Sequence, residues 1–161
     1  MFGQIPPFAL TERSGETFGS DDLRGTTWVA SFLFTRCPDV CPMVSANMKR
    51  LQEHSTTPAL VSFSVDPGHD DPATLARYAE RFHAGPQWRF LTGPRDDIAE
   101  LLTDGFRVAF GDGGPADQPV THSDRLVLVD GSLQIRGYYH GRSDQDLVRL
   151  ERDLTSLATT D

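Results

Sequence analysis

Two cysteines, Cys37 and Cys41, are the residues of this chain best suited to chemistry, because they are its only cysteines and lie four positions apart. They follow an apolar run, residues 26–34, that is typical of a strand. Residues four apart share one face of a helix, so a helix that begins near Pro38 would direct both sulfurs to one point. Free backbone N–H groups and the positive end of the helix dipole favour thiolates at that point. Two thiolates together bind a soft metal ion or, when oxidised, form a disulfide.

The competing interpretation is that the cysteines are inert core residues, which is common for isolated cysteines. Against it, each cysteine is followed by a proline, and the pair lies at the end of a strand-like run rather than inside an apolar stripe. Helical periodicity continues over residues 43–53, so the order along the chain is strand, turn, thiols, helix. This order favours a reactive site at a strand-to-helix junction.

The elements that must position this site alternate between strand-like and helical patterns. Strands are expected at residues 59–65, 88–92, 106–110, 125–129 and 133–139, helices at 72–82, 96–102 and 144–157, and a short hairpin at 8–18. Asp71 is expected to cap the helix that begins at Pro72. Outside the fragment 106–110, residues 104–121 show little periodicity and are expected to form a loop leading to His122. The pattern predicts an α/β fold with a central mixed sheet flanked by helices and an N-terminal β-hairpin.

Length and composition predict one domain, residues 1–161, because a chain of 161 residues with 38% hydrophobic content can bury a core without disulfides. The formal net charge is −8, from 15 basic and 23 acidic residues. This charge disfavours a nucleic-acid surface and favours a basic partner, although an acidic surface also serves solubility. No segment has the pattern of a membrane span or a signal peptide, so the chain as written is expected to be soluble.

The segment Cys37-Pro38-Asp39-Val40-Cys41-Pro42 resembles the signature of the SCO/SenC family of copper-binding proteins, which assist the assembly of cytochrome c oxidase. Further segments resemble the family in the same order, and the resemblance covers residues 8–155: Val65-Asp66-Pro67, Asp70-Asp71-Pro72, Trp88-Arg89-Phe90-Leu91-Thr92-Gly93, and His122-Ser123 leading into residues 126–131. The resemblance implies a thioredoxin-like fold and copper, as Cu(I), Cu(II) or both. It also implies that the partner is a copper-acceptor subunit of cytochrome c oxidase, with another copper chaperone as a candidate donor.

The resemblance also implies a location. SCO-like proteins generally carry an N-terminal membrane anchor that this sequence does not show, so a trimmed chain and a naturally anchorless member both stay open. The expected location is outside the bacterial cytoplasmic membrane, either periplasmic or anchored to that membrane, ahead of the mitochondrial intermembrane space.

His122 is implied by the resemblance as a third metal ligand beside Cys37 and Cys41. A lone histidine is ordinarily polar surface, but this one directly precedes an apolar strand. Thr121 departs from the family pattern, in which an acidic residue often precedes the histidine. Two thiolates and an imidazole suit copper, and three ligands leave an open position that eases transfer of the ion.

The same cysteines have two alternative roles. In a thiol-disulfide oxidoreductase, Cys37 would be the attacking thiolate and Cys41 the resolving thiol. In a redox sensor, the state of the cysteines would change binding to another protein without catalysis. Three intervening residues, where thioredoxins have two, favour copper over the oxidoreductase.

Other candidate residues carry less weight. Asp66 is expected to position a neighbouring loop rather than bind metal, and His69 is an exposed loop histidine or an extra ligand. Arg36 would favour thiolate in the adjacent cysteine but repel incoming copper. Met43 and Met48 are expected to pack on an amphipathic helix rather than to bind copper. Three more histidines are expected to be ordinary surface residues: His54, His83 and His140.

Overall fold

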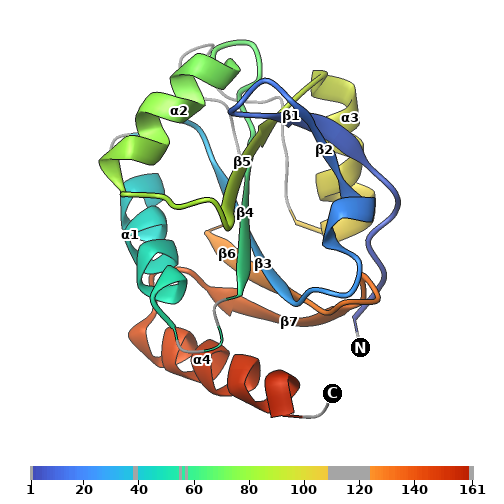
Figure 1. The fold of residues 1–161 in the computed structure, drawn as a ribbon, viewed down its shortest axis with the longest axis vertical. Helices are drawn as coiled ribbons and strands as arrows, with labels where there is room; N and C mark the ends of the chain where they lie inside the picture. Colours follow the sequence, from blue (N-terminus) through green and yellow to red (C-terminus); the bar gives the residue numbers. More distant parts are fainter. Residues whose placement is uncertain (1, 38–39, 55, 57, 109–123, 160–161) are drawn as a thin grey trace.

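A mixed β-sheet forms the centre of the computed structural model, which describes residues 2–37, 40–54, 56, 58–108 and 124–159. In these residues the sheet has seven strands in the order β2-β1-β5-β4-β3-β6-β7 (Figure 1). Strands β3, β4 and β5 are parallel, and the other pairs are antiparallel. The strands are β1 (Ala9–Glu12), β2 (Thr17–Gly19), β3 (Trp28–Leu33), β4 (Ala59–Ser64), β5 (Trp88–Thr92), β6 (Arg125–Val129) and β7 (Ile135–His140).

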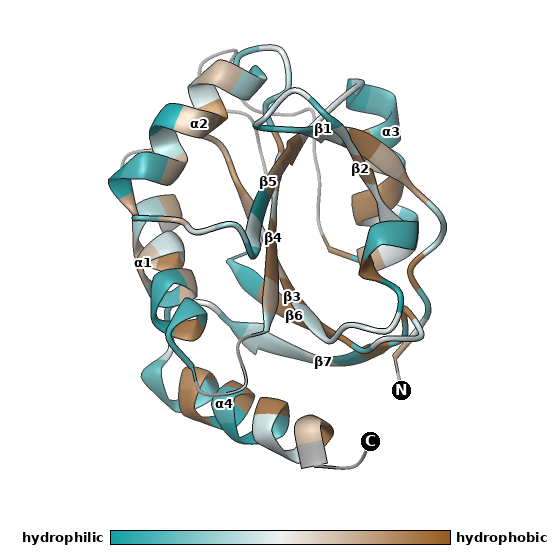
Figure 2. Cartoon of the chain, viewed as in Figure 1, coloured by the Kyte–Doolittle hydropathy of each residue, from teal (hydrophilic) through white to brown (hydrophobic). Residues whose placement is uncertain are grey.

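Helices cover both faces of this sheet. On one face, α1 (Val40–Gln52), α2 (Pro72–Arg81) and α4 (Asp144–Thr159) contribute side chains to a common core cluster. On the other face, α3 (Arg95–Glu100), the π-helical turn η2 (Leu101–Phe106) and the N-terminal segment share a second cluster, and the short 3₁₀ turn η1 (Ser20–Leu23) joins it through Leu23. Figure 2 shows the brown, apolar stripes of the helices facing inward and the teal, polar faces outward. The predicted mixed sheet flanked by helices is confirmed, as is the N-terminal hairpin of β1 and β2.

The central strand β3 positions the cysteines. All six of its residues are buried, because β4 pairs with it on one side, β6 pairs on the other and helices cover both faces. Such a strand reads as a continuous apolar run rather than an alternating one. Its carboxyl end lies beside that of β4, because Leu33 pairs with Ser64 in parallel register. The segments that follow these two strands therefore meet at one edge of the sheet.

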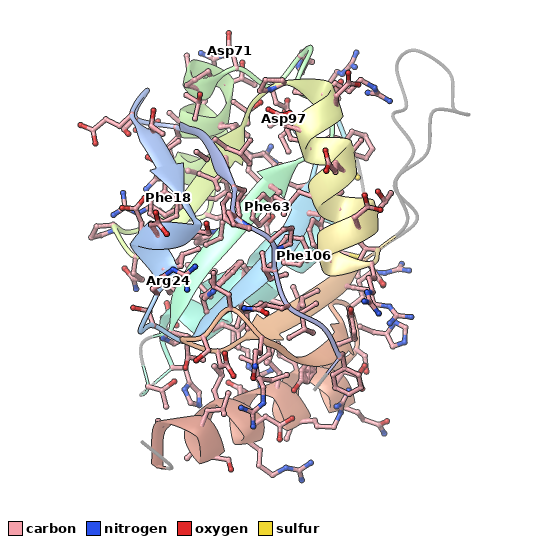
Figure 3. All side chains as sticks on the ribbon, turned by 90° about the vertical axis from the view of Figure 1, so that its right-hand side faces the viewer. Phe18, Arg24, Phe63, Asp71, Asp97 and Phe106 are labelled. Atoms are coloured by element: carbon pink, nitrogen blue, oxygen red, sulfur yellow. The ribbon has the colours of Figure 1, made fainter. Side chains whose placement is uncertain are left out.

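One sequence-based element boundary needs correction. Phe106 does not begin a strand: it ends η2, and its ring lies 5.2 Å from those of Phe32 and Phe63, in the core between sheet and helix (Figure 3). Arg107 then has a left-handed backbone with φ of 60°, which ends the turn, and residues 109–110 lie outside the described part. An apolar residue every few positions fits a buried helical turn as well as a strand, which explains the error. Helix α1 is described from Val40, two residues after Pro38, and residues 38–39 lie outside the described part.

The edge strand β7 is covered at both ends. At its start, Phe2 N–H donates to Ile135 O (3.0 Å) and Ile135 N–H donates to Gly3 O (2.8 Å). Toward its end, Arg149 of α4 donates to the carbonyl oxygen of Tyr138 (3.1 Å), and the carboxylate of Asp146 accepts from His140 N–H. Unpaired edge groups are thus satisfied by elements other than a strand.

None of the helices in the described ranges combines the length and the apolar character needed to cross a membrane.

Candidate metal centre

The two cysteines come together at the junction of β3 and α1. Cys37 lies four residues past the end of β3, and its N–H donates to Phe34 O (3.0 Å) in a tight turn. Cys41 lies in the first turn of α1, and its N–H donates to Cys37 Sγ at 3.3 Å. Cys37 therefore precedes the helix instead of sharing its face, and a free N–H of the first turn still brings its sulfur to Cys41. Both cysteines are unbridged.

The two thiols differ in their surroundings. Cys37 is half-buried, whereas Cys41 is only 4% exposed and belongs to the core cluster beneath α1. Burial raises the pKa of Cys41 to about 12, chiefly because a thiolate is poorly solvated there, and the contact with Cys37 adds to the increase. The backbone amide of Phe34 opposes the increase in pKa but does not overcome it. The raised pKa disfavours the thiolate at Cys41, contrary to the expectation that both sulfurs favour it.

A buried carboxylate, Asp70, holds the segment before the cysteines. It is fully buried in the loop between β4 and α2, and it accepts three hydrogen bonds. Thr35 donates from its N–H (3.1 Å) and from its hydroxyl, and Ser64 Oγ donates at 2.8 Å. Thr35 lies two residues before Cys37, so the β4–α2 loop fixes the point at which the chain turns toward the sulfurs.

The neighbouring residue Arg36 is held by the same loop. Its Nε and Nη2 both donate to Asp66 Oδ2, at 3.0 and 2.7 Å. The Asp66 side chain is 11% exposed and that of Arg36 is 35% exposed. Asp66 also accepts, through its carbonyl oxygen, the N–H groups of His69 and Asp70. These contacts fit the predicted positioning role of Asp66. They also place the negative charge of its carboxylate against the guanidinium of Arg36.

His122, the third expected ligand, lies outside the described residues. Asp124, two positions after His122, is described, and it is hydrogen-bonded to the turn between β7 and α4. Its carbonyl oxygen accepts from Gly141 N–H (2.8 Å), and its carboxylate accepts from Arg142 Nε (3.0 Å). That turn contacts α1, because Asn47 Nδ2 donates to Gly141 O (2.6 Å). Asp124 is thus connected through one turn to the helix that carries Cys41.

The space around Gly141 gives a test of this connection. A Cβ at Gly141 would lie 2.5 Å from Asp124 O and 3.1 Å from Val44 Cγ1, and Val44 is three residues beyond Cys41 in α1. Gly141→Ala is therefore expected to push α1 and the start of β6 apart and to lower the free energy of unfolding by about 1–3 kcal/mol. The measurement is thermal unfolding of the metal-free protein.

The matched control for Gly141→Ala is Gly68→Ala, because a Cβ at Gly68 meets no atom within 4 Å. That variant is expected to stay within about 0.5 kcal/mol of the parent. If both variants unfold like the parent, the contact between the turn and α1 is looser than these distances indicate.

The remaining candidate residues, Met43, Met48 and His69, differ in their burial. Met48 is buried in the core as expected, but Met43 is 52% exposed, so the packing interpretation is wrong for Met43. It occupies a position on α1 that the sheet does not cover. His69 is exposed. Among the described residues, no three Cys, His, Asp or Glu side chains form a group that could hold a metal ion.

Asp70 is the residue whose importance sequence reasoning missed. In the sequence it stands in an Asp-Asp-Pro segment, where its neighbour Asp71 caps α2 by accepting from Thr74 N–H (2.8 Å). The sequence does contain one indication of its role. A helix needs only one N-cap, so if Asp71 caps α2, Asp70 is free to make other contacts. The sequence gives no means of identifying Thr35 and Ser64 as its partners.

A mixed sheet with helices on both faces, and a cysteine pair where a central strand passes into a helix, defines the thioredoxin-like class of proteins. The chain belongs to the SCO1/SenC family, whose family model matches residues 3–157. A SCO1/SenC family lipoprotein from Bacillus anthracis has the same fold, with a TM-score of 0.90 and 34% identity over 98% of this chain and 96% of that one.

Two further similar proteins bear on chemistry. BsSco, a member of the Sco family of cytochrome c oxidase assembly proteins in which a disulfide switch was identified, is 27% identical with a TM-score of 0.87 over 100% of this chain and 96% of that one. A Stutzerimonas stutzeri protein whose name ascribes copper binding to it is 30% identical over 95% of this chain and 76% of its own length. The family resemblance and the thioredoxin-like fold are thereby confirmed.

Proposed function

We propose that this protein binds one copper ion through Cys37, Cys41 and His122 and delivers it during assembly of the copper site of cytochrome c oxidase. The observation that carries the proposal is the hydrogen bond from Cys41 N–H to Cys37 Sγ (3.3 Å), which, together with the side-chain contact between the two cysteines, brings two soft donors close to each other. Thiolates select Cu(I), and an imidazole adds a ligand that both oxidation states accept. Membership of the SCO1/SenC family supports copper as the ion.

The difference in burial between the cysteines suits delivery. Cys41 is enclosed by the core, whereas Cys37 remains half-exposed at the surface. An acceptor can therefore reach the ion from the side of Cys37 while Cys41 still holds it. A site with an open coordination position releases an ion more easily than a closed cage of four ligands. Asp124, two residues after His122, is hydrogen-bonded to the turn that packs on α1. This connection supports His122 as the third ligand in the proposal.

Anaerobic titration of the reduced protein with Cu(I) and then Cu(II) tests the proposal directly. One equivalent of copper per chain is expected to be retained against a chelator of moderate affinity. Binding well below one equivalent in both oxidation states would refute the metallochaperone role.

A histidine variant tests the third ligand. His122→Ala is expected to weaken Cu(II) binding by at least about tenfold and Cu(I) binding by less, because the softer ion depends mainly on sulfur. His69→Ala is the control, since its exposed side chain lies on the β4–α2 loop, and it should leave both affinities unchanged. Unchanged affinities in His122→Ala, or a loss in His69→Ala instead, would show that the third ligand is misassigned.

Thiol-disulfide exchange is a second candidate function, favoured by the same hydrogen bond. Cys41 N–H donates to Cys37 Sγ, and this sulfur, as the thiolate, would attack a substrate disulfide and release one substrate thiolate. Cys41 would then attack the mixed disulfide, releasing the second substrate thiol and leaving a Cys37–Cys41 disulfide. Rapid turnover of a disulfide substrate without tight copper binding would favour this function over delivery.

Family membership supports a proposal for the partner and the location. We infer that the acceptor is the copper-binding subunit of cytochrome c oxidase and that the domain acts outside the bacterial cytoplasmic membrane. The lipoprotein nature of the Bacillus anthracis protein supports a membrane-associated position for the family domain.

A further inference from the structure

A groove runs between the N-terminal segment and α3. Residues 6–10 form one wall, Asp97 and Glu100 of α3 with Leu101 of η2 form the other, and the cavity between them measures about 290 Å³. Figure 3 shows α3, with Asp97 labelled, beside the N-terminal segment. We infer that this α3 groove is a docking site for a basic, extended segment of a protein partner. The helix α3 and the cysteine-bearing α1 pack on opposite faces of the sheet, so the groove is separate from the proposed copper site.

The N-terminal wall of the groove is held in place at two points. Phe8 N–H donates to Ser20 Oγ (3.1 Å), and the carbonyl oxygen of Phe8 accepts from Ser20 N–H (2.9 Å). Pro6 packs on η2 so closely that a Cβ at Gly105 would lie 2.9 Å from Pro6 Cδ. The wall is therefore positioned before a ligand arrives, which lowers the ordering cost of binding.

The groove combines apolar residues with exposed negative charge. Leu10 and Leu101 line it and are buried, whereas the side chains of Asp97 and Glu100 are exposed. None of the described residues that line the groove is basic. Lysine and arginine match both parts, because they pack their methylene groups on apolar surface and keep the charged head in water. The net charge of −8 on the whole chain adds long-range attraction for a basic partner.

The two carboxylates also set a spacing for the ligand. Asp97 and Glu100 are three residues apart on α3, so they share a face of the helix, with Cβ atoms about 5–6 Å apart. In an extended segment, side chains two positions apart point to the same side and are separated by about 6.6 Å. Basic residues at alternate positions therefore match the two carboxylates, one cation to each. Pro6 and Pro7 have no N–H groups to offer an anion, which disfavours an acidic ligand.

Peptide binding to the reduced, metal-free protein tests the inference. The probe is a fluorescein-labelled octapeptide of alternating arginine and leucine, and its matched control has uncharged citrulline in place of each arginine. Saturable binding of the arginine peptide is expected in fluorescence anisotropy. The citrulline peptide is expected to bind at least about fivefold more weakly, because one exposed ion pair changes affinity by up to about fivefold and both pairs are lost.

Two double variants remove the same charge from different faces of the protein. Asp97→Asn/Glu100→Gln removes both carboxylates of the α3 groove and is expected to weaken binding of the arginine peptide by roughly fivefold or more. Glu80→Gln/Asp144→Asn is the matched control, because it removes two exposed carboxylates from α2 and α4 on the other face. This control should change the affinity by less than about twofold in physiological salt. Both double variants are expected to unfold near the parent temperature, because the replaced side chains are exposed.

Three results would overturn the inference. Equal weakening in the two double variants would show that the peptide responds only to the net charge of the protein. No saturable binding to the parent would show that the groove does not take a basic segment. If the parent sediments as a dimer that Asp97→Asn/Glu100→Gln dissociates, the occupant of the groove is a second copy of this chain. None of these measurements uses copper, so their outcome is independent of the proposed function.

Discussion

Replacement of either cysteine by serine is expected to remove tight Cu(I) binding. A hydroxyl is a hard, poorly ionised donor that Cu(I) does not favour. Structural zinc sites gain about 10–16 kcal/mol from their whole ligand set, so the loss of one of three ligands should lower copper affinity by roughly 10²- to 10⁴-fold. The measurement is competition with a Cu(I)-specific chromogenic chelator under anaerobic conditions.

The two serine variants provide a control for each other. Cys41 is in the core, so Cys41→Ser buries a hydroxyl and should also lower the free energy of unfolding by about 1–3 kcal/mol. Cys37 is half-buried, so Cys37→Ser should unfold close to the parent temperature. Loss of copper in both variants, with loss of stability in only one, would separate ligation from packing. Parent-like Cu(I) affinity in either variant would remove that cysteine from the site.

Asp70→Ala is expected to be the most destabilising single change at the carboxyl ends of β3 and β4, beside the cysteines. It leaves Thr35 N–H and two hydroxyls without the carboxylate that accepts from them. Removal of one partner from such a buried charged network costs about 3–5 kcal/mol. In a chain of this size that loss lowers the melting temperature by about 6–20 °C. Thermal unfolding of the metal-free protein measures the effect without any assumption about copper.

The adjacent aspartate gives the matched control for Asp70→Ala. Asp71 is exposed and accepts one hydrogen bond from Thr74 N–H at the start of α2. Asp71→Ala should therefore unfold at a higher temperature than Asp70→Ala. Equal melting temperatures for the two variants would show that Asp70 does not hold the loop before the cysteines.

Local signals in the sequence were sufficient to predict most of the fold. Alternating strand and helix patterns located β3, β5 and β6, and the Asp71-Pro72 pair marked the start of α2. These signals depend on neighbouring residues, which a sequence displays directly. The error at Phe106 arose where an apolar pattern fits two structures and only tertiary packing decides between them.

The candidate site could be predicted only in part for the same reason. The spacing of Cys37 and Cys41 identified the pair, but Cys41 is buried by residues distant in the sequence, and this burial raises its pKa. Asp66 lies 30 positions from Arg36, and Thr35, one of the two residues whose hydroxyls donate to Asp70, lies 35 positions from it, so neither contact is visible in a local pattern. The exposure of Met43 likewise depends on how the amphipathic helix α1 is placed on the sheet.

The covered edge at β7 limits how this protein can associate with others. A partner that binds by adding an extended segment to a sheet needs a row of free main-chain donors and acceptors. At β7 the main-chain groups of Ile135 are hydrogen-bonded to the N-terminal segment. The carbonyl oxygen of Tyr138 and the N–H of His140 are hydrogen-bonded to side chains of α4. Strand addition there would have to break these hydrogen bonds first. A partner that binds at this edge is therefore expected to contact side chains of β7 and α4 rather than to add a strand.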